Sequence, residues 1–129
     1  MIRPLLVLLA LTTAFVLACS GSPPGVRDIS PDDLMARAQD ADVLILDVRT
    51  PTEYETGHVP GAINIPFDEV EARLDELEPH RDGEIVLYCE SGRRAGKAGD
   101  VLTGAGFEGI HHLEGDMSGW RKAGRPTEH

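Results

Sequence analysis

The sequence predicts a single α/β domain whose core is a five-stranded, mainly parallel β-sheet with helices on both faces. Short runs of β-branched and aromatic residues alternate with segments whose apolar residues recur at helical spacing, a pattern typical of a parallel sheet covered on both sides. With 129 residues, the chain is long enough for one domain with a modest core. The expected strands lie near residues 27–29, 43–46, 62–65, 85–88 and 110–113.

Two short helices are predicted by their starts. Ser30 is a typical helix cap, Pro31 suits the first helical position and Asp33 stands three residues after the cap. Thr50 and Pro51 repeat this pattern after the second strand, so another short helix is expected there. The first helix is expected to bury Leu34, Met35 and Ala38.

A longer helix is expected over residues 67–77, between the third and fourth strands. Its apolar residues recur every three or four positions and acidic residues occupy the others, which indicates one buried and one solvated face. The predicted buried face consists of Phe67, Val70, Leu74 and Leu77. A terminal helix is expected after the last strand, with Trp120 packed on the core.

The fourth expected strand ends at Cys89, and a helical pattern begins near Arg94. The thiol therefore lies between the carboxyl end of a strand and the amino end of a helix. Gly104 and Gly106 are expected to end this helix. The residues at helical spacing are Ala95, Ala98, Val101, Leu102 and Ala105.

This position suits a reactive cysteine. A helix amino terminus and neighbouring arginines stabilise a thiolate, and the N–H groups of a tight loop bind small anions. We therefore interpret Cys89 as a nucleophile rather than as a small buried apolar residue, with Arg94 beside it. Gly92 is expected to supply a backbone conformation that a side chain would resist. The anion-binding loop is expected to comprise Glu90, Ser91, Gly92, Arg93 and Ala95.

The loop resembles the active-site loop of rhodanese-type sulfurtransferases, whose pattern is Cys-x-x-Gly-x-Arg. In this sequence four residues separate Cys89 from Arg94. Protein tyrosine phosphatases place five residues between the cysteine and the arginine, and the position where they would have the arginine is Ala95 here. An earlier segment, from Asp47-Val48-Arg49 through 57–66, resembles the amino-terminal signature of the same family. The matching loop residues are Cys89-Glu90-Ser91-Gly92-Arg93-Arg94.

The resemblance covers roughly residues 29–126 and implies a complete rhodanese-like fold with sulfurtransferase activity. The Cys89 thiolate would take the outer sulfur of a donor such as thiosulfate and pass it, as a persulfide, to cyanide or a thiol. Arg94 would brace the loop and Arg93 would meet the incoming anion. Glu90 would disfavour thiosulfate and favour a neutral or protein-borne donor. The resemblance implies no cofactor.

Other polar residues are interpreted as structural. Asp47 and Arg49 are expected to form an ion pair at a strand end, and His58 is assigned to turn structure because transfer to an ionised thiolate needs no base. His111 and His112 lack metal-ligand spacing, so no metal is assigned. The family often carries a glycine where Asp116 stands, and aspartate tolerates the left-handed backbone better than most residues.

Residues 1–18 are interpreted as an export signal, because Arg3 precedes an apolar run shorter than a membrane-spanning helix. Val16-Leu17-Ala18-Cys19 resembles a bacterial lipobox, which implies a lipidated Cys19, a linker over 19–25 and a rhodanese-like domain over 26–129. The alternatives are an ordinary secretory signal cut after Ala18 or a retained anchor. The expected product is an exported bacterial lipoprotein, tethered to a membrane and facing the periplasm or the cell exterior.

A formal net charge of −10 excludes a nucleic-acid-binding role and disfavours direct attachment to an anionic membrane surface. The charge also motivates a second hypothesis, a membrane-tethered persulfide carrier or protein-binding module that docks to a fixed partner. A third hypothesis, a phosphatase or arsenate reductase, rests only on the presence of a thiolate beside an arginine.

Overall fold

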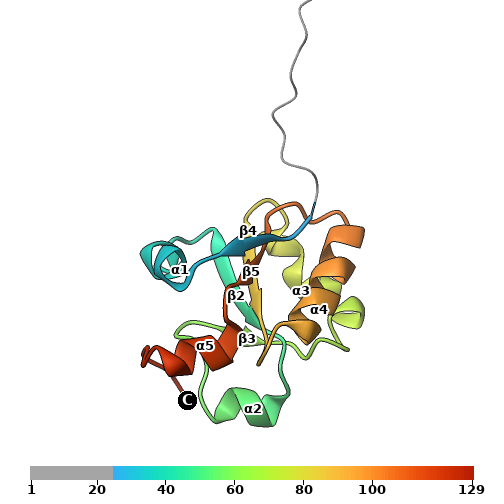
Figure 1. The fold of residues 1–129 in the computed structure, drawn as a ribbon. Coiled ribbons are helices and arrows are strands. Elements are labelled where there is room, and N and C mark those ends of the chain that lie inside the picture. Colours follow the sequence, from blue (N-terminus) through green and yellow to red (C-terminus); the bar gives the residue numbers. More distant parts are fainter. Residues whose placement is uncertain (1–24) are drawn as a thin grey trace, which may run out of the picture.

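The computed structural model describes residues 25–129, which form one five-stranded sheet in the order β1-β5-β4-β2-β3. Every paired strand in this sheet is parallel to its neighbour, so the predicted α/β class and strand count are confirmed (Figure 1). β4 lies in the middle of the sheet, and its carboxyl end leads into the cysteine loop. The strands are β1 (Arg27–Ile29), β2 (Val43–Asp47), β3 (Ile63–Asn64), β4 (Glu84–Tyr88) and β5 (Ile110–Leu113).

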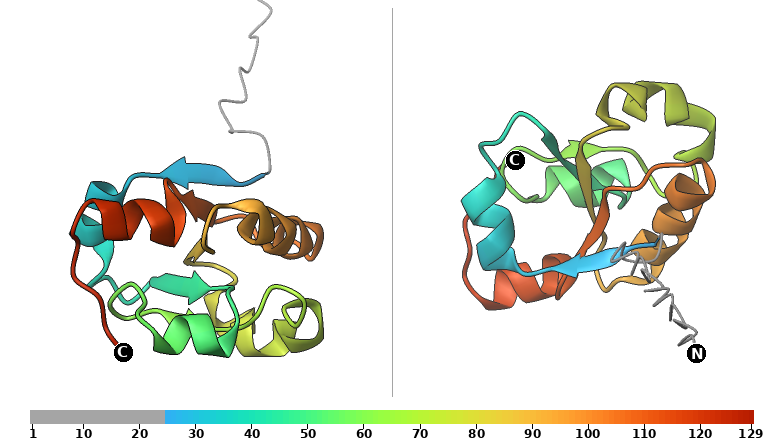
Figure 2. Two further views of the ribbon diagram at one scale, coloured as in Figure 1. Left: turned by 60° about the horizontal axis from the view of Figure 1, so that its bottom comes forward. Right: turned by 90° about the horizontal axis from the view of Figure 1, so that it is seen from above.

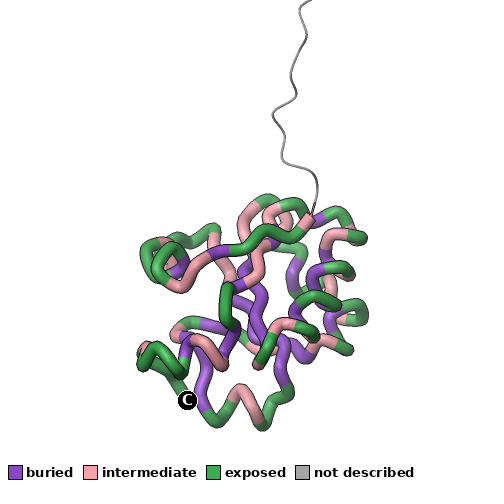
Figure 3. The backbone as a smooth tube through the Cα atoms, in the orientation of Figure 1, coloured by how far each residue is buried: buried purple, intermediate pink, exposed green. Residues whose placement is uncertain are grey.

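Helices cover both faces of the sheet, as the alternating pattern predicts (Figure 2). Two separate apolar clusters form the core. One lies between the sheet and the side of α3 and α4, and the other lies between the sheet and the side of α1 and α5. Figure 3 shows the buried strands between exposed helix surfaces. The helices are α1 (Pro31–Arg37), α2 (Pro51–Glu55), α3 (Leu74–Leu77), α4 (Arg93–Gly104) and α5 (Asp116–Lys122).

The predicted helix starts are confirmed. The Ser30 hydroxyl accepts a hydrogen bond from the Asp33 amide at 3.1 Å, and Thr50 forms a reciprocal capping box with Glu53. Leu34 is fully buried, but the expected burial of Met35 is wrong, because 45% of Met35 is exposed. A seven-residue helix packed by one edge buries a narrow stripe, and Met35 lies outside it.

The predicted single helix over residues 67–77 is also wrong. A turn precedes a 3₁₀ segment (Glu71–Arg73), the short α3 and a second 3₁₀ segment (Glu78–His80). At Arg73 the backbone leaves helical values, with φ −117° and ψ 22°. Apolar residues spaced three and four positions apart suit both an α-helix and a 3₁₀ helix. The predicted apolar residues are therefore buried although the segment is not one continuous helix. Val70 and Leu77 are fully buried, with Phe67 and Leu74 packed beside them.

No helix within residues 25–129 is long and apolar enough to cross a membrane. The predicted export signal (1–18), the lipidated Cys19 and nearly all of the linker (19–25) lie outside the described residues.

Candidate active site

Cys89 directly follows the central strand β4, and the loop after it ends at the first turn of α4. The Gly92 N–H donates a hydrogen bond to the Cys89 Sγ at 3.0 Å. N–H groups in the first turn of a helix have no acceptor within that helix, so those of α4 add to the positive field around the sulfur. The sulfur therefore occupies the position expected for a stabilised thiolate or persulfide. Because Cys89 is only 1% exposed, a slender sulfur donor suits it better than a bulky group.

Gly92 must be glycine for two reasons. Its φ of 109° lies in the left-handed region that side chains resist, and it caps α4 in this conformation. An added Cβ would also approach Asp116 Oδ2 to 3.1 Å and the His112 ring to 3.5 Å. The expectation of a special backbone conformation at Gly92 is confirmed.

Arg94 connects the loop helix to α2. Its guanidinium donates two hydrogen bonds to the Glu53 carboxylate, at 2.8 and 3.1 Å. The hydrogen bond from Arg94 lowers the pKa of Glu53 to about 2, although partial burial opposes the shift. The same pair raises the pKa of Arg94, to which the nearby Cys89 also contributes. The positive charge beside the thiol is thus held in place, and α2 rather than the loop itself holds it.

The other loop residues differ in where they point. Arg93 and Ser91 are exposed at the mouth of the loop, whereas Ala95 is buried in the core, so it offers only its backbone to the loop. Glu90 is half-buried and lies between two arginines, Arg49 with Nη1 at 3.6 Å and Arg121 in direct contact. Its negative charge is therefore partly balanced.

A cleft of about 630 Å³ opens beside Glu90. Its charged lining consists of Glu90, Glu53 and three arginines, Arg49, Arg121 and Arg125. Each of the three guanidinium groups pairs with a carboxylate, which leaves the cleft close to neutral: Arg49 with Asp47, Arg121 with Glu90 and Arg125 with Asp32. The −10 of the whole chain is therefore not concentrated here, and it does not exclude an anionic donor or acceptor.

Asp47 and Arg49 form a fully buried ion pair with a 2.7 Å contact, and Arg49 also donates to the Gly57 carbonyl at 2.7 Å. Burial alone would lower the pKa of Arg49, but the hydrogen bond and charge of Asp47 raise it overall. Tyr88 lies under the same guanidinium and its hydroxyl accepts from the Val59 amide at 3.0 Å. Burial raises the pKa of Tyr88. This network fixes the segment after α2, which agrees with the structural interpretation of the pair.

His58 likewise supports the turn. Its ring stacks on Tyr54 with centroids 3.7 Å apart, and its Nδ1 lies 2.9 Å from the Tyr54 carbonyl. Within residues 25–129, no three His, Cys, Asp or Glu side chains are arranged to hold a metal ion.

Asp116 is the site residue that sequence reasoning underestimated. It adopts φ 52° at the start of α5, as expected for an aspartate in a glycine position. Its Oδ1 also accepts a hydrogen bond from the Cys89 amide at 3.0 Å, and both of its oxygens contact His112 Nε2, at 2.9 and 3.0 Å. Next to it, the Met117 amide donates to the Cys89 carbonyl at 3.0 Å. The departure from glycine was the only sequence signal for these contacts.

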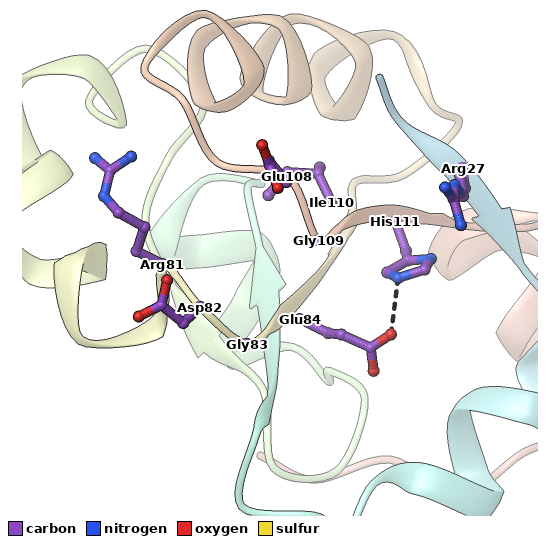
Figure 4. Close-up of a pocket in the computed structure, with 9 residues that line it drawn as sticks. All are labelled: Arg27, Arg81, Asp82, Gly83, Glu84, Glu108, Gly109, Ile110 and His111. Carbon is purple, nitrogen blue, oxygen red and sulfur yellow. Dashed lines mark hydrogen bonds and ion pairs between the residues drawn. The ribbon is translucent and has the colours of Figure 1, made fainter. Parts of the chain in front are cut away.

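A second cavity, of about 360 Å³, lies at the opposite ends of the same strands (Figure 4). Its charged side chains include Arg27, Arg81 and Glu108, and His111 Nε2 lies 3.1 Å from Glu84. Ligands of parallel α/β sheets bind at the carboxyl ends of strands, whereas this cavity lies at the amino ends of β4 and β5. We therefore place the candidate site at Cys89.

Residues 30–123 match the family described as the rhodanese-like domain. Over 102 residues the chain is 34% identical to a sulfurtransferase of Allochromatium vinosum, covering 78% of this chain and 94% of that protein. It is 37% identical over 70 residues to the thiosulfate sulfurtransferase PspE of Escherichia coli, covering 54% of this chain and 67% of that protein.

Another relative, an uncharacterized protein of Synechocystis, is 40% identical over 101 residues, but the chain spans only 54% of its length. Among solved structures, the rhodanese-related protein of Thermoplasma volcanium superposes with a TM-score of 0.70 at 31% identity, covering 79% of this chain and 97% of that one.

Proposed function

This chain belongs to the rhodanese-like family, and we propose that it is a sulfurtransferase working through a persulfide on Cys89. The observation that carries the proposal is the buried Cys89 sulfur receiving an N–H donor at 3.0 Å where β4 meets α4. Preorganised donors of this kind stabilise an anion without reorganisation during the reaction.

The proposed reaction has two steps. The Cys89 thiolate attacks the outer sulfur of thiosulfate, the bond between the two donor sulfurs breaks, and sulfite leaves with that electron pair. Cyanide or a thiolate then attacks the outer sulfur of the persulfide, which returns Cys89 as a thiolate. The loop N–H groups hold the negative charge in both resting states, so neither step needs a general base.

Arg94 and Arg93 have separate proposed roles. Arg94, fixed by Glu53, braces the loop and keeps a positive charge near the sulfur. Arg93 is exposed at the loop mouth and meets the incoming anion. Thiosulfate as the donor is supported by the similarity to PspE and by the guanidinium groups that line the adjacent cleft.

The alternatives predict different products. A phosphatase or arsenate reductase needs an arginine whose guanidinium is free to bind a tetrahedral anion, whereas Arg94 donates two hydrogen bonds to Glu53. A persulfide carrier or binding module would accept sulfur without turnover and bind a partner protein.

Steady-state formation of thiocyanate from thiosulfate and cyanide tests the proposal. The full chain with Cys19→Ser keeps Cys89 as its single cysteine, so every reaction at sulfur reports on one residue. We expect ping-pong kinetics, which give parallel double-reciprocal plots, and no release of phosphate from an aryl phosphate. Phosphate release without thiocyanate would overturn the assignment.

We propose the lipid anchor on Cys19 from the sequence alone. Labelling cells with a radioactive fatty acid should mark the full chain and place it in the membrane fraction, and Cys19→Ser should lose both. A secreted, unlabelled parent would show an ordinary export signal instead.

A further inference from the structure

The amide of Cys89 is held by a carboxylate rather than by another backbone group. Asp116 Oδ1 accepts its hydrogen bond at 3.0 Å, and Asp116 is only 3% exposed. The other oxygen of Asp116 lies 3.1 Å from where a Gly92 Cβ would stand. One side chain from the start of α5 therefore holds the Cys89 amide and leaves little room for a side chain at Gly92.

This arrangement raises an electrostatic problem. A buried carboxylate beside a residue that reacts as an anion disfavours that anion, because like charges at short range raise the pKa of an acid. If Asp116 only filled a turn, glycine would adopt φ 52° with less strain. The carboxylate must therefore be balanced for the thiolate to form readily.

His112 is the group that can balance it. It extends from β5, and its Nε2 lies within 3.0 Å of both Asp116 oxygens. The hydrogen bond to Asp116 raises the pKa of His112 against the opposing effect of burial. From β1, Asp28 approaches His112 Nδ1 to 3.5 Å and also favours the imidazolium.

The remaining charged groups near the thiol lie on other elements. Arg94 on α4 is paired with Glu53 of α2, while Arg49 is paired with the buried Asp47 and, together with Arg121, with Glu90. These pairs are largely balanced internally. The protonation of His112 thus decides whether the buried side of the loop carries a net negative charge.

We propose that Asp116 and His112 are positioning residues for Cys89: Asp116 fixes the thiol-bearing residue through its amide, and His112 supplies the positive charge that offsets Asp116. The inference rests on the proposed nucleophilic role of Cys89. As pH rises and His112 loses its proton, Asp116 is left uncompensated and the thiolate becomes harder to form.

The rate of alkylation by iodoacetamide against pH tests the pair, in the full chain with Cys19→Ser. We expect His112→Gln to move the midpoint for Cys89 upward by roughly half a pH unit to one unit. Asp116→Asn keeps an oxygen acceptor for the Cys89 amide, so it should leave the midpoint at or below that of the parent. In the double variant the upward shift should disappear.

His111→Gln is the matched control. This histidine is the neighbour of His112 on β5, but it pairs with Glu84 at the amino end of β4. It should leave the midpoint unchanged. Equal midpoints in the parent and in His112→Gln, or the same upward shift with Asp116 removed, would overturn the proposal.

A measurement without substitution guards against misfolded variants. Because coupling between two charges is reciprocal, alkylating Cys89 to a neutral thioether should lower the pKa of His112 measured by NMR. An unchanged His112 titration would overturn the inference. Neither measurement uses a sulfur donor, so a protein that takes up sulfur but shows no coupling refutes only this pair. A protein that takes up no sulfur refutes the proposed function instead.

Discussion

The two ends of β4 and β5 differ in how their polar groups are used. At the amino ends, Glu84 forms ion pairs with Arg37 and with His111, and Glu84 and His111 also line the open cavity there. At the carboxyl ends, the loop at Cys89 is held by partners from α2 and α5, while its sulfur receives a donor and remains chemically free.

The backbone also differs, because Asp116 at the carboxyl end, with φ 52°, is the one residue other than glycine with a positive φ within residues 25–129. Gly92 beside it also has a positive φ, and an added Cβ there would approach Asp116 Oδ2 to 3.1 Å. Strained backbone of this kind persists only where surrounding structure determines it, and it gathers at functional sites. A cavity alone is thus a weaker indicator of function than a reactive group that neighbouring residues hold in place through specific hydrogen bonds and ion pairs.

Cys89→Ser should have the largest effect. A serine hydroxyl does not ionise near neutral pH and forms no persulfide, so thiocyanate formation should fall by at least about a thousandfold. The thermal midpoint should change little, because the substitution is nearly isosteric. Turnover above a tenth of the parent rate would place the chemistry elsewhere and remove the contrast between the two ends.

Gly92→Ala should be next. Strain at φ 109° and the approach to Asp116 should lower the free energy of unfolding by about 1–3 kcal/mol, with activity down roughly tenfold or more. Gly96→Ala is the control, because no atom lies within 4 Å of its added Cβ on α4. It should stabilise the protein by about 0.5–1 kcal/mol, as alanine does in helices. Equal effects at both positions, measured by urea unfolding, would show that the loop conformation is not constrained.

The Arg94–Glu53 pair should have an intermediate effect. Because the folded pKa of Glu53 is about 2 against an ordinary value of 4.5, its contribution to stability is present above pH 4.5 and is lost as pH falls toward 2. Glu53 is about a third exposed, so screening limits this contribution to about 0.5–1 kcal/mol.

Glu53→Gln should therefore abolish that part of the acid dependence. It should also lower thiocyanate formation by more than the small loss of stability explains, because Arg94 loses its partner. The acid dependence is measured as urea midpoints between pH 2 and 6, with Glu76→Gln as the control because Glu76 also pairs with an arginine. A parent whose stability has the same acid dependence as Glu53→Gln would contradict the depressed pKa.

The amino end should show the smallest effect. Glu84→Gln removes an ion pair whose members are about a third exposed, so the free energy of unfolding should fall by at most about 1 kcal/mol. Thiocyanate formation should stay within twofold of the parent. A tenfold loss of activity with an intact fold would mean that the second cavity takes part in function.

The sequence allowed the sheet and the thiol position to be predicted because both depend on local patterns. The two longest strands, β2 and β4, are short apolar runs bounded by turn residues, and Cys89 directly follows β4. The prediction of one helix over residues 67–77 was wrong because apolar spacings of three and four residues fit both α- and 3₁₀ helices. The pattern therefore predicted the buried residues correctly but not the backbone conformation.

The supports of the loop could not be predicted because they join distant segments. Arg94 and Glu53 are 41 residues apart, and Asp116 and the Cys89 amide are 27 apart. Each residue has an ordinary local explanation: Glu53 completes a capping box and Asp116 fills a turn. These carboxylates gain their second role only in the fold, where Glu53 of α2 reaches Arg94 and Asp116 of α5 reaches the Cys89 amide.

Intact-mass spectrometry of the full chain with Cys19→Ser, before and after thiosulfate, shows directly whether Cys89 takes up sulfur. We predict a gain of one sulfur atom that cyanide removes and that Cys89→Ser never shows. If the parent gains no sulfur from thiosulfate, from a polysulfide or from a low-molecular-weight persulfide, Cys89 is not a sulfur-transfer site and the proposed function is wrong.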